Sequence, residues 1–379
     1  MYIRKQIFEG LGKESAFLWG ARQTGKSTLL KSLYPGALYF DLLLGNEFER
    51  FQRNPSLLRE ITGAANIQGP VIVDEIQRIP SLLNEIHWLI ENKKIQFILS
   101  GSSPRKIVRS GGNLLGGRAI RYELYPLVYP EIPGFDLLNA LNFGLLPRHY
   151  LSPHPQKLLS AYVGSYLRDE IMTEAKIRNI SSFSRFLEMA AFSNGEMVNY
   201  SNIASECGVS APTIKEYFQI LEDTMTGRFL QSFQKKPKRR VILAPKFYIF
   251  DVGIANFLIK RGKVDYGSEA FGKAFEHFIY QELYSHSNYS GSNYPLAYWR
   301  TASQIEIDFV LGDHEVAIEV KSTNNATSRH LKGLKSFTEE YTVKKTILVS
   351  NDPLPRIVDG IHIMPWHIFL DKLWGGEIL

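Results

Sequence analysis

The stretch Gly20-Ala-Arg-Gln-Thr-Gly25-Lys26-Ser27 matches the pattern G-x-x-x-x-G-K-[ST], a glycine-rich turn between a strand and a helix. An apolar run, 16–19, leads into it, and a helical pattern follows from residue 28. In such a turn, successive backbone N–H groups point at phosphate oxygens, and the positive end of the helix dipole adds to the attraction. The residues expected to bind a nucleotide are Gly20, Ala21, Arg22, Gln23, Thr24, Gly25, Lys26, Ser27 and Thr28.

Two side chains of this turn are expected to have separate tasks. Lys26 would reach the β and γ phosphates of ATP, and the Ser27 hydroxyl would ligate Mg²⁺. A chance glycine turn is the alternative. The strand and helix patterns on either side of the turn favour the phosphate site over that alternative.

A second apolar run, 71–73, ends in the two carboxylates Asp74 and Glu75, the Walker B arrangement. Asp74 would hold Mg²⁺ through water, and Glu75 would polarise the attacking water as a general base. Taken alone, an apolar strand that ends in Asp-Glu is commonly structural. Downstream of a phosphate-binding turn, it predicts a catalytic pair.

Two further side chains complete the predicted hydrolysis site. The run 97–100 leads to Ser102, which we expect to reach the γ-phosphate from a strand beside that of Asp74; capping of the following helix is the alternative. Arg118 precedes the last predicted strand of this region. An arginine at a subunit edge can stabilise transition-state charge on a neighbouring subunit's nucleotide, and a surface ion pair is the alternative.

The amino-acid composition limits the classes of protein to which the chain can belong. The chain has 379 residues, 44% of them hydrophobic and 22% charged, which is typical of globular domains and not of disordered chains. The formal net charge of +6 permits a polyanionic partner. A single cysteine, Cys207, excludes an intramolecular disulfide and an all-cysteine zinc site. Since no apolar run reaches the ~18 residues of a membrane span and no signal-peptide core is evident, we expect a cytoplasmic protein without a membrane partner.

The order of elements predicts an α/β fold. Short β-rich runs alternate with helical patterns in the first third, as in a parallel sheet covered by helices. The strands predicted there are 15–19, 37–41, 70–74, 96–100 and 119–124. The last third predicts a helix over 271–283, strands over 305–311, 315–321 and 346–349, and an exposed loop over 285–293.

The segment 201–221 has the layout of a helix-turn-helix in a winged-helix module. Gly208 would make the turn, Ser210 would cap a second helix, and Cys207 would be a small buried residue. The side chains expected to contact DNA phosphates are Thr213, Lys215, Lys235, Lys236, Lys238, Arg239 and Arg240. Glu206 and Glu216 weaken the case for insertion into a groove, so docking of a protein remains an alternative.

The C-terminal third groups acidic residues with a lysine. Strand periodicity places Glu319 and Lys321 on one face, and a short turn would bring Asp308 alongside them. Together with Glu276 on a helix, these residues resemble the PD-(D/E)xK nuclease core. That resemblance implies carboxylates that bind Mg²⁺ and a lysine that orients the attacking water. A solvated Glu–Lys pair on an alternating strand is the alternative, and the fold can also serve only to bind DNA.

The chain resembles a bacterial and archaeal family of AAA-type ATP-binding proteins whose C-terminal half has no known function. The match is carried by Gly20-Ala-Arg-Gln-Thr-Gly-Lys-Ser, Asp74-Glu-Ile-Gln-Arg-Ile-Pro80, Leu99-Ser-Gly-Ser-Ser103, Gly117-Arg118, Tyr122-Glu-Leu-Tyr-Pro-Leu127, Tyr166-Leu-Arg-Asp169 and Ala317-Ile-Glu-Val-Lys321. It implies an ATPase that works as an oligomer, a hexameric ring being the expected form. We expect an AAA-type P-loop core over 1–130, a helical lid over 131–178, a winged helix over 179–262 and a restriction-endonuclease-like α/β domain over 263–379.

Three functions remain open from the sequence. The first is an oligomeric ATPase that remodels or translocates DNA, selecting DNA structure rather than sequence. The second is an ATP-gated, Mg²⁺-dependent DNA nuclease. The third is a nucleotide-dependent protein scaffold of the kind found among signalling ATPases, in which DNA has no part.

Overall fold

The computed structural model describes residues 2–6, 8–105, 107, 115–171, 179–235 and 241–379. By its internal contacts the chain divides into two compact units. The N-terminal unit comprises Ile7–Pro126 and Ile220–Thr226, and the C-terminal unit comprises Met1–Gln6, Leu127–Gln219 and Gly227–Leu379. Each unit has its own sheet and its own hydrophobic core.

The N-terminal unit is built on a five-stranded sheet in which every neighbouring pair is parallel. Its strands are β1 (Ala16–Trp19), β2 (Tyr39–Asp41), β3 (Val71–Asp74), β4 (Phe97–Gly101) and β5 (Ile120–Glu123). Their order across the sheet is β2-β3-β4-β1-β5. The predicted α/β class and parallel sheet are confirmed for this unit. The carboxyl ends of parallel strands share one edge, so the loops after β1, β3 and β4 meet there.

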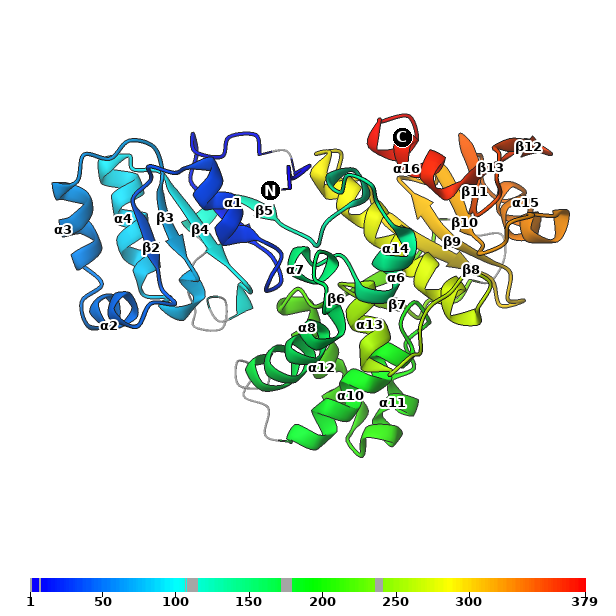
Figure 1. The fold of residues 1–379 in the computed structure, drawn as a ribbon, viewed down its shortest axis with the longest axis horizontal. Coiled ribbons are helices and arrows are strands. Elements are labelled where there is room, and N and C mark those ends of the chain that lie inside the picture. Colours follow the sequence, from blue (N-terminus) through cyan, green and yellow to red (C-terminus); the bar gives the residue numbers. More distant parts are fainter. Residues whose placement is uncertain (1, 7, 106, 108–114, 172–178, 236–240) are drawn as a thin grey trace. The chain divides into compact units, whose positions relative to one another are not determined.

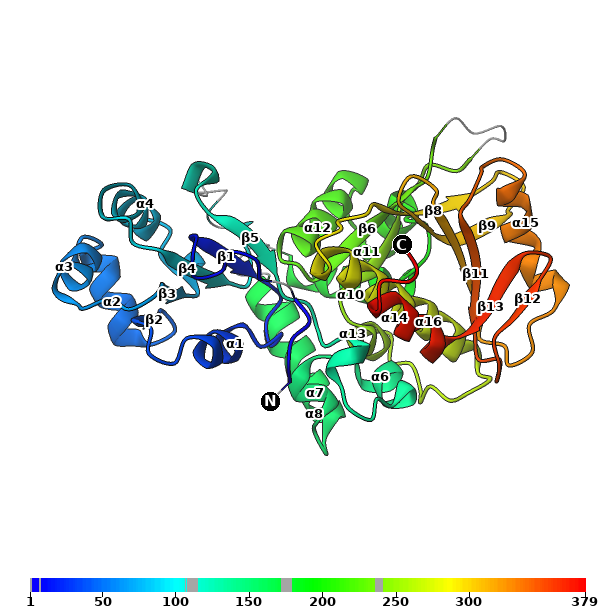
Figure 2. The ribbon, with the colours of Figure 1, turned by 90° about the horizontal axis from the view of Figure 1, so that it is seen from above.

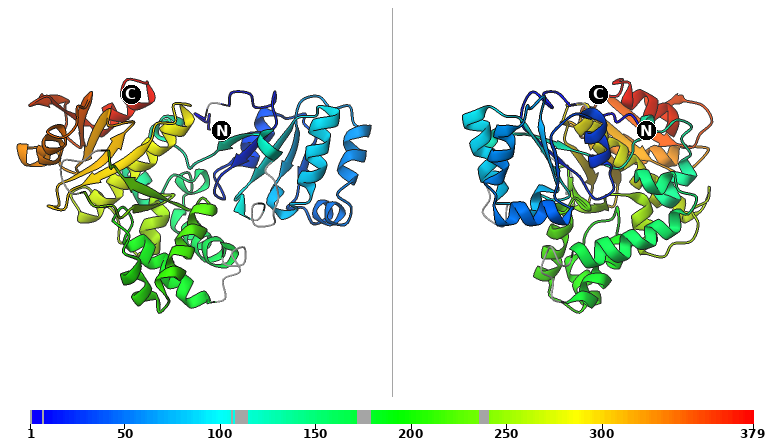
Figure 3. Two further views of the ribbon diagram at one scale, coloured as in Figure 1. Left: turned by 180° about the vertical axis from the view of Figure 1, so that it is seen from behind. Right: turned by 60° about the vertical axis from the view of Figure 1, so that its left-hand side comes forward.

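Helices cover both faces of this sheet. They are α1 (Lys26–Leu33), α2 (Gly45–Arg53), α3 (Leu57–Ala64) and α4 (Leu82–Lys93), with short 3-10 turns η1 (Ile76–Arg78) and η2 (Leu115–Gly117). Figure 1 shows α1 on one side of the sheet and α4 on the other, and Figure 3 shows the same arrangement from behind. Alternate strand residues, including Trp19 and Val73, pack in one core with Leu82, Ile86 and Leu89 of α4. This apolar packing fixes the strand ends that carry polar residues.

The C-terminal unit contains helices along its whole length. They are η3 (Tyr129–Glu131), α6 (Leu137–Phe143), α7 (Pro147–Tyr150), α8 (Pro155–Ala161), η4 (Tyr162–Glu170), α10 (Ile180–Phe192), α11 (Tyr200–Cys207), α12 (Ala211–Asp223), α13 (Val252–Leu258), α14 (Glu269–Tyr289), η5 (Ser328–Leu331), α15 (Lys332–Thr338) and α16 (Trp366–Trp374). The last residues of α12 belong to the N-terminal unit. Among the described residues, no helix has both the length and the hydropathy needed to cross a membrane.

An eight-stranded mixed sheet forms the centre of the C-terminal unit, in the order β12-β13-β11-β10-β9-β8-β6-β7. The strands are β6 (Gly227–Ser232), β7 (Lys246–Ile249), β8 (Leu296–Arg300), β9 (Glu306–Leu311), β10 (Val316–Val320), β11 (Lys345–Ser350), β12 (Arg356–Val358) and β13 (Ile361–Pro365). Strands β10, β11 and β13 run parallel to one another, so their carboxyl ends also meet at one edge. Figure 2 shows α14 and α16 on one side of these strands and α15 on the other.

The expected exposed loop over 285–293 was wrong for its first part. Helix α14 continues to Tyr289, and Ser285, His286, Ser287 and Tyr289 are buried. The polar side chains are satisfied inside the unit: the Ser287 hydroxyl donates to the Tyr294 carbonyl at 2.7 Å, and the His286 ring packs against Trp374. Polar composition predicted solvent exposure because these partners lie outside the segment.

Candidate functional site

The turn between β1 and α1 has the shape expected of a phosphate-binding loop. Gln23 and Gly25 have φ angles of 64° and 95°, in the left-handed region that reverses the chain direction. A Cβ atom on Gly20 would lie 2.3 Å from the Leu124 carbonyl oxygen, so only glycine fits there. The glycines of the motif are therefore required by the local backbone.

Lys26 lies inside this turn. Its Nζ donates to the carbonyl oxygens of Gly20 at 2.7 Å and Ala21 at 3.1 Å, and the Thr24 hydroxyl also donates to Ala21, at 2.9 Å. Burial lowers the pKa of Lys26, while the carboxylates of Glu75 and Asp74 oppose that shift. The ammonium group therefore lies within electrostatic reach of both acids at the end of β3.

Asp74 ends β3 and is held by neutral donors. Its Oδ1 accepts hydrogen bonds from the Ser100 hydroxyl and from the Glu75 N–H, and its Oδ2 accepts from the Tyr39 hydroxyl at 2.6 Å. The register of the sheet pairs Asp74 directly with Ser100 of the adjacent strand β4. Burial and the neighbouring Asp74 raise the pKa of Tyr39, so this hydroxyl remains a donor.

The same tyrosine joins Asp74 to the phosphate-binding turn. Ser27 also acts on the Tyr39 hydroxyl and lowers its pKa, so the Ser27 and Asp74 oxygens both lie near this group. Hydroxyl and carboxylate oxygens are the protein ligands that Mg²⁺ takes beside water and substrate phosphates. These two side chains therefore fit the predicted magnesium site.

Glu75 follows Asp74 with an unusual backbone. Its φ of 60° lies in the left-handed region, which is uncommon for a residue other than glycine and marks functional sites. The Gln77 amide Nε2 donates to Glu75 and, at 3.0 Å, to the Ser102 hydroxyl. A Cβ atom on Gly101 would lie 2.2 Å from Gln77 Oε1, so the glycine makes room for this amide. The structure thus links Glu75 to Ser102 through Gln77.

The sequence did not lead us to predict three residues of this site: Tyr39, Gln77 and Ser100. Ser100 lies in the run of hydroxyl residues from which Ser102 was chosen, and only the strand register shows that Ser100 contacts Asp74. Gln77 lies in the quoted segment that follows Asp74, and a polar amide so close to Asp74 and Glu75 could have indicated a role in the site. Tyr39 had no signal, because its partner Asp74 is on another strand.

Arg118 is not beside the phosphate-binding turn. It precedes β5, so it lies at the amino-terminal edge of the parallel sheet, opposite the edge formed by the loops after β1, β3 and β4. It forms an ion pair with Glu91, and the Arg118 guanidinium lowers the pKa of that carboxyl. Within one chain, then, Arg118 does not reach the candidate nucleotide site.

The helix pair α11 and α12 follows the expected layout. Gly208 ends α11 with a φ of 64°, and the Ser210 hydroxyl accepts from the Thr213 N–H at 3.3 Å. Cys207 is buried, and Lys215 is exposed, 5.3 Å from the centre of the Tyr200 ring. Of the predicted basic wing, Lys235 is paired with Asp313. The other members, Lys236, Lys238, Arg239 and Arg240, lie outside the described residues.

The C-terminal unit brings together all four residues of the predicted nuclease-like set. Asp308 of β9 accepts from the Val320 N–H at 2.7 Å, and Lys321 forms an ion pair with Glu319. Electrostatic coupling of Asp308 to both Glu276 and Lys321 places the four groups in one cluster. The pairing of β9 with β8 shifts by one residue around Asp308, and such bulges redirect side chains.

A second lysine, Lys246, was not predicted in this cluster. It is 3% exposed and pairs with Glu306 at 2.6 Å and Glu276 at 3.3 Å. The Tyr248 hydroxyl also donates to Glu276, at 2.7 Å. Lys246 begins β7, which the register joins to β6 and so to the same sheet. We name Glu276, Glu306, Asp308, Glu319, Lys246 and Lys321 the acid–lysine cluster.

Burial governs the protonation of this cluster. It raises the pKa of Asp308 to about 6, with Glu276 adding to the shift. It raises the pKa of Glu319 to about 8, with Asp308 adding to the shift and Lys321 opposing it. The carboxylates Glu276, Glu306 and Asp308 instead raise the pKa of Lys246 against the effect of burial. Lys246 and Lys321 thus supply positive charge to this cluster, and Glu319 in addition keeps its proton up to about pH 8.

This arrangement bears on metal binding. Across the described residues, no three acidic, histidine or cysteine side chains are grouped as metal ligands. In the acid–lysine cluster, ammonium groups contact Glu276, Glu306 and Glu319, where a metal ion would have to bind. The cluster in this arrangement does not fit a bound divalent cation.

The parallel sheet, the curled turn and the acids that follow β3 define a P-loop nucleoside-triphosphatase-like domain. In agreement, residues 13–133 match the family model described as an AAA domain. Residues 134–265 and 271–369 match models described as Domain of unknown function (DUF8612) and Domain of unknown function (DUF4143). No curated protein matches the chain.

Proposed function

We propose that the chain binds ATP with Mg²⁺ at the turn between β1 and α1 and hydrolyses it to ADP and phosphate. The observation that carries this proposal is the pair Asp74 and Glu75 at the end of β3, electrostatically coupled to Lys26 of the turn. Ser27 and Asp74 would hold the magnesium ion, which neutralises charge on the phosphates. The AAA-domain match supports the class of reaction.

Each protein group has a task in this reaction. Lys26 would exchange its loop carbonyls for β and γ phosphate oxygens, and Glu75 would accept a proton from the attacking water. Gln77 would orient that water, because its Oε1 is buried and has no hydrogen-bond partner among the described residues. Ser102 would face the γ-phosphate from the end of β4, where Gln77 already holds its hydroxyl.

The direct test separates binding from hydrolysis. Lys26→Ala should abolish ATP binding in calorimetry, and Glu75→Gln should keep ATP binding while hydrolysis falls. Lys93→Ala, which removes an exposed lysine from α4, is the matched control and should behave as the unmodified chain. ATP binding by Lys26→Ala at unchanged affinity would contradict the assignment of this turn.

We further propose that the active form is a ring of several copies, six being the expected number, in which Arg118 of one copy reaches the nucleotide of the next. The position of Arg118 at the far edge of the sheet supports this, since Arg118 cannot serve its own nucleotide. Arg118→Ala should lower ATP turnover by about 10³-fold. Arg121→Ala, on the edge strand β5 that follows Arg118, is the control. If Glu91→Ala lowers turnover as much, the ion pair with Glu91 explains the effect and transfer between copies is refuted.

We propose DNA as the substrate that the ATPase moves or remodels, through a winged-helix module and the nuclease-like fold of the C-terminal unit. Support comes from the net charge of +6, the capped helix pair α11 and α12, and the exposed Lys215. ATP turnover should rise with one or more of single strands, duplexes, forks and four-way junctions. The log of DNA affinity should fall with the log of salt concentration by about 0.9 for each phosphate contact.

Two exposed lysines provide the test variant and the control variant for DNA binding. Lys215→Ala should reduce the salt slope by about one contact, whereas Lys344→Ala, which removes a similarly exposed lysine, should leave it unchanged. ATP turnover that is unchanged by every DNA form, with no salt-dependent binding, would refute the DNA proposal. That result, combined with ATP-dependent self-assembly, would favour the protein scaffold.

Cleavage of DNA by the C-terminal unit is the second proposal. Its specific support is the convergence of Asp308, Glu319, Lys321 and Glu276, and the contacts of Lys246 with two glutamates count against it. If cleavage occurs, plasmid nicking with Mg²⁺ or Mn²⁺ should be lost in Asp308→Ala and Lys321→Ala. Plasmid that stays intact with either metal would refute this second proposal and leave the ATPase proposal untouched.

A further inference from the structure

A cavity lies in the C-terminal unit at the edge where its three parallel strands end. Its volume is about 670 Å³. Its lining includes residues within three positions of the end of each strand: Ser322 and Thr323 after β10, Asn351 after β11, and Trp366 after β13. In open α/β sheets, ligands bind in the crevice at the carboxyl ends of parallel strands. The topology therefore marks this cavity as a binding site before its chemistry is considered.

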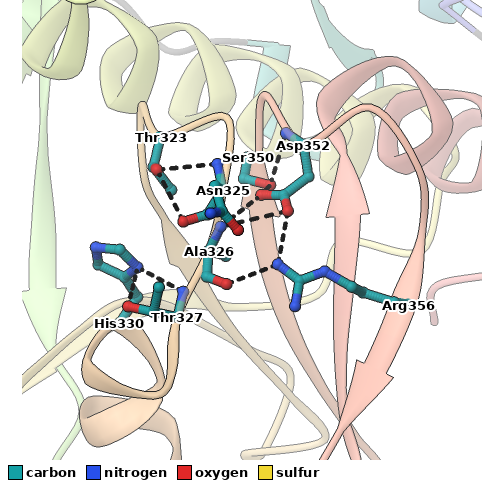
Figure 4. Close-up of polar contacts among 8 residues, drawn as sticks. All are labelled: Thr323, Asn325, Ala326, Thr327, His330, Ser350, Asp352 and Arg356. Carbon is teal, nitrogen blue, oxygen red and sulfur yellow. Dashed lines mark hydrogen bonds and ion pairs between the residues drawn. The ribbon is translucent and has the colours of Figure 1, made fainter.

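One wall of the cavity is fixed by a buried carboxylate, shown in Figure 4. Asp352 accepts hydrogen bonds from the Ala326 N–H at 3.0 Å, the Ser350 hydroxyl at 2.8 Å and Arg356 at 2.7 Å. Arg356 also donates to the Ala326 carbonyl, at 2.6 Å. The bonds from Arg356 and Ser350 lower the pKa of Asp352 against the effect of burial. The wall is thus preorganised, and the negative charge of Asp352 is already neutralised by Arg356.

The charge that remains free in the cavity is positive. Arg329, His330 and His367 line it, and among the described residues no ion pair is recorded for Arg329. The Thr327 N–H donates to His330 Nδ1 at 3.0 Å and Arg329 Nε donates to His330 Nε2 at 3.4 Å, and a ring nitrogen that accepts belongs to a neutral imidazole. Burial and the cations Arg329 and Lys321 lower the pKa of His330, which favours this neutral form. The terminal guanidinium nitrogens of Arg329 are therefore the donors available to an anion.

Other lining residues match the remaining parts of a nucleotide. Trp366 and Tyr266 bring aromatic rings to the cavity, and aromatic rings stack on nucleobases. The Asn351 Oδ1 atom is buried and has no partner among the described residues, while its Nδ2 donates to the Ser322 carbonyl at 3.0 Å. An unpaired buried acceptor requires a donor, such as a sugar hydroxyl or a base amine. The volume is within the range of about 300–1,000 Å³ typical of ligand sites.

We propose that this cavity binds a nucleoside monophosphate unit, with its phosphate on Arg329, which His330 holds at Nε, and its base against Trp366 or Tyr266. Two sources share this chemistry: a free nucleotide, and the phosphorylated end of a nucleic-acid strand. Ser322 directly follows Lys321 of the acid–lysine cluster, so a strand end in the cavity would place its next residues beside that cluster. This site is separate from the P-loop and does not depend on ATP hydrolysis.

The test uses the whole chain carrying Lys26→Ala, so that nucleotide binding at the P-loop is removed. Calorimetric titration with deoxyadenosine monophosphate, and with one short single strand in its 5′-phosphorylated and unphosphorylated forms, compares the two sources. Either the mononucleotide or the phosphorylated strand should bind. Arg329→Ala should weaken that binding by about tenfold or more, because a hydrogen bond to a charged group is lost.

Controls decide whether the effect belongs to the cavity. Arg148→Ala removes an exposed arginine elsewhere in the unit and should leave affinity unchanged. Since Arg329 is exposed, its replacement should not disturb folding, and Arg329→Lys should restore part of the affinity. Binding of the mononucleotide alone identifies a small ligand, and preference for the phosphorylated strand identifies a strand end. Equal affinity for both strand forms without mononucleotide binding, or no binding at all, overturns the proposal, whatever the outcome of the ATPase assays.

Discussion

The two units each bury a group of carboxylates beside a lysine, but they neutralise the acids in different ways. At the end of β3, Asp74 is held by the hydroxyls of Ser100 and Tyr39, and the nearby Lys26 is held by backbone carbonyls. In the acid–lysine cluster, Lys246 and Lys321 form ion pairs with the acids directly. Neutral donors leave the charge of Asp74 available to a cation from outside. Internal lysines occupy that role in the C-terminal unit, so we expect chemistry at the first site and structural or binding work at the second.

The largest effect is expected at Glu75. Glu75→Gln keeps the size of the side chain and its polar contact with Gln77 but removes the base, so ATP turnover should fall by about 10²–10⁴-fold. ATP affinity should stay within about threefold, because the Lys26 and Ser27 contacts remain. A phosphate-release assay and calorimetry on the same preparation measure both quantities. The exposed Glu60 of α3 supplies the control, Glu60→Gln. Turnover near that of the unmodified chain would show that Glu75 is not the base.

The next largest effect is expected at Lys246, the buried cation of the acid–lysine cluster. Lys246→Met removes a buried ammonium and leaves Glu276 and Glu306 without their partner, so the free energy of unfolding should fall by about 3–5 kcal/mol. Lys344→Met breaks an exposed pair with Glu315 and should cost less than about 1 kcal/mol. Urea denaturation measures both variants. A loss for Lys246→Met no greater than that of its control would mean that the lysine does not neutralise the cluster, and metal binding there would regain support.

Site residues could be predicted from the sequence where their partners lie close in the chain, and could not where their partners lie on distant strands. The P-loop is a local motif, and the turn from Gly20 to Ser27 forms from residues adjacent in the chain. Asp308, Glu319 and Lys321 could be grouped because a short turn joins β9 to β10. Lys246 could not be added, since it comes from β7 and meets Glu276 only once β6 and β7 join the same sheet.

The same limit applies to the fold. Short apolar runs gave the five strands of the N-terminal unit to within two residues, because β1, β3 and β4 are buried on both faces and β2 and β5 each keep a buried aromatic residue. The end of α14 was missed, because Ser287 and His286 find their partners in residues that composition does not identify. Tyr39 and Ser100 show this again, since strand register, not chain proximity, brings both hydroxyls to Asp74.

The pH dependence of the free energy of unfolding tests the comparison between the two sites at Glu319. Its folded-state pKa of about 8 lies above the ordinary value of a glutamate, so the native state binds the proton more tightly than the unfolded state. This contribution to stability is complete below pH 4.5 and is lost as pH rises through about 8. Between pH 6 and pH 9 the loss from Glu319 should be about 3 kcal/mol, and Glu319→Gln should remove it.

Glu282 provides an internal comparison for that titration. Burial raises its pKa to about 8 as well, but its partners are the Trp374 N–H and the Tyr129 amide, not lysines. Glu282→Gln should therefore remove a separate part of the same pH dependence, and Glu60→Gln should remove none. Urea denaturation at both pH values gives the result. A Glu319→Gln profile that declines as steeply as that of the unmodified chain would mean that Glu319 ionises normally in the folded protein.

The smallest effect is expected from a group that touches the magnesium ligands without being one of them. Tyr39→Phe removes the hydroxyl that donates to Asp74 and lies near Ser27, so Asp74 loses a fixed orientation and Ser27 loses a polar neighbour. The Mg²⁺ concentration for half-maximal ATP turnover should rise by about tenfold, because such outer contacts tune metal affinity. Turnover at saturating Mg²⁺ should change little, since Glu75 and Lys26 are unaltered. Tyr34→Phe, at the end of α1, is the matched control, and its Mg²⁺ dependence should equal that of the unmodified chain. A uniform fall in turnover at every Mg²⁺ concentration would assign Tyr39 a structural role and leave the neutral-donor explanation of this site without support.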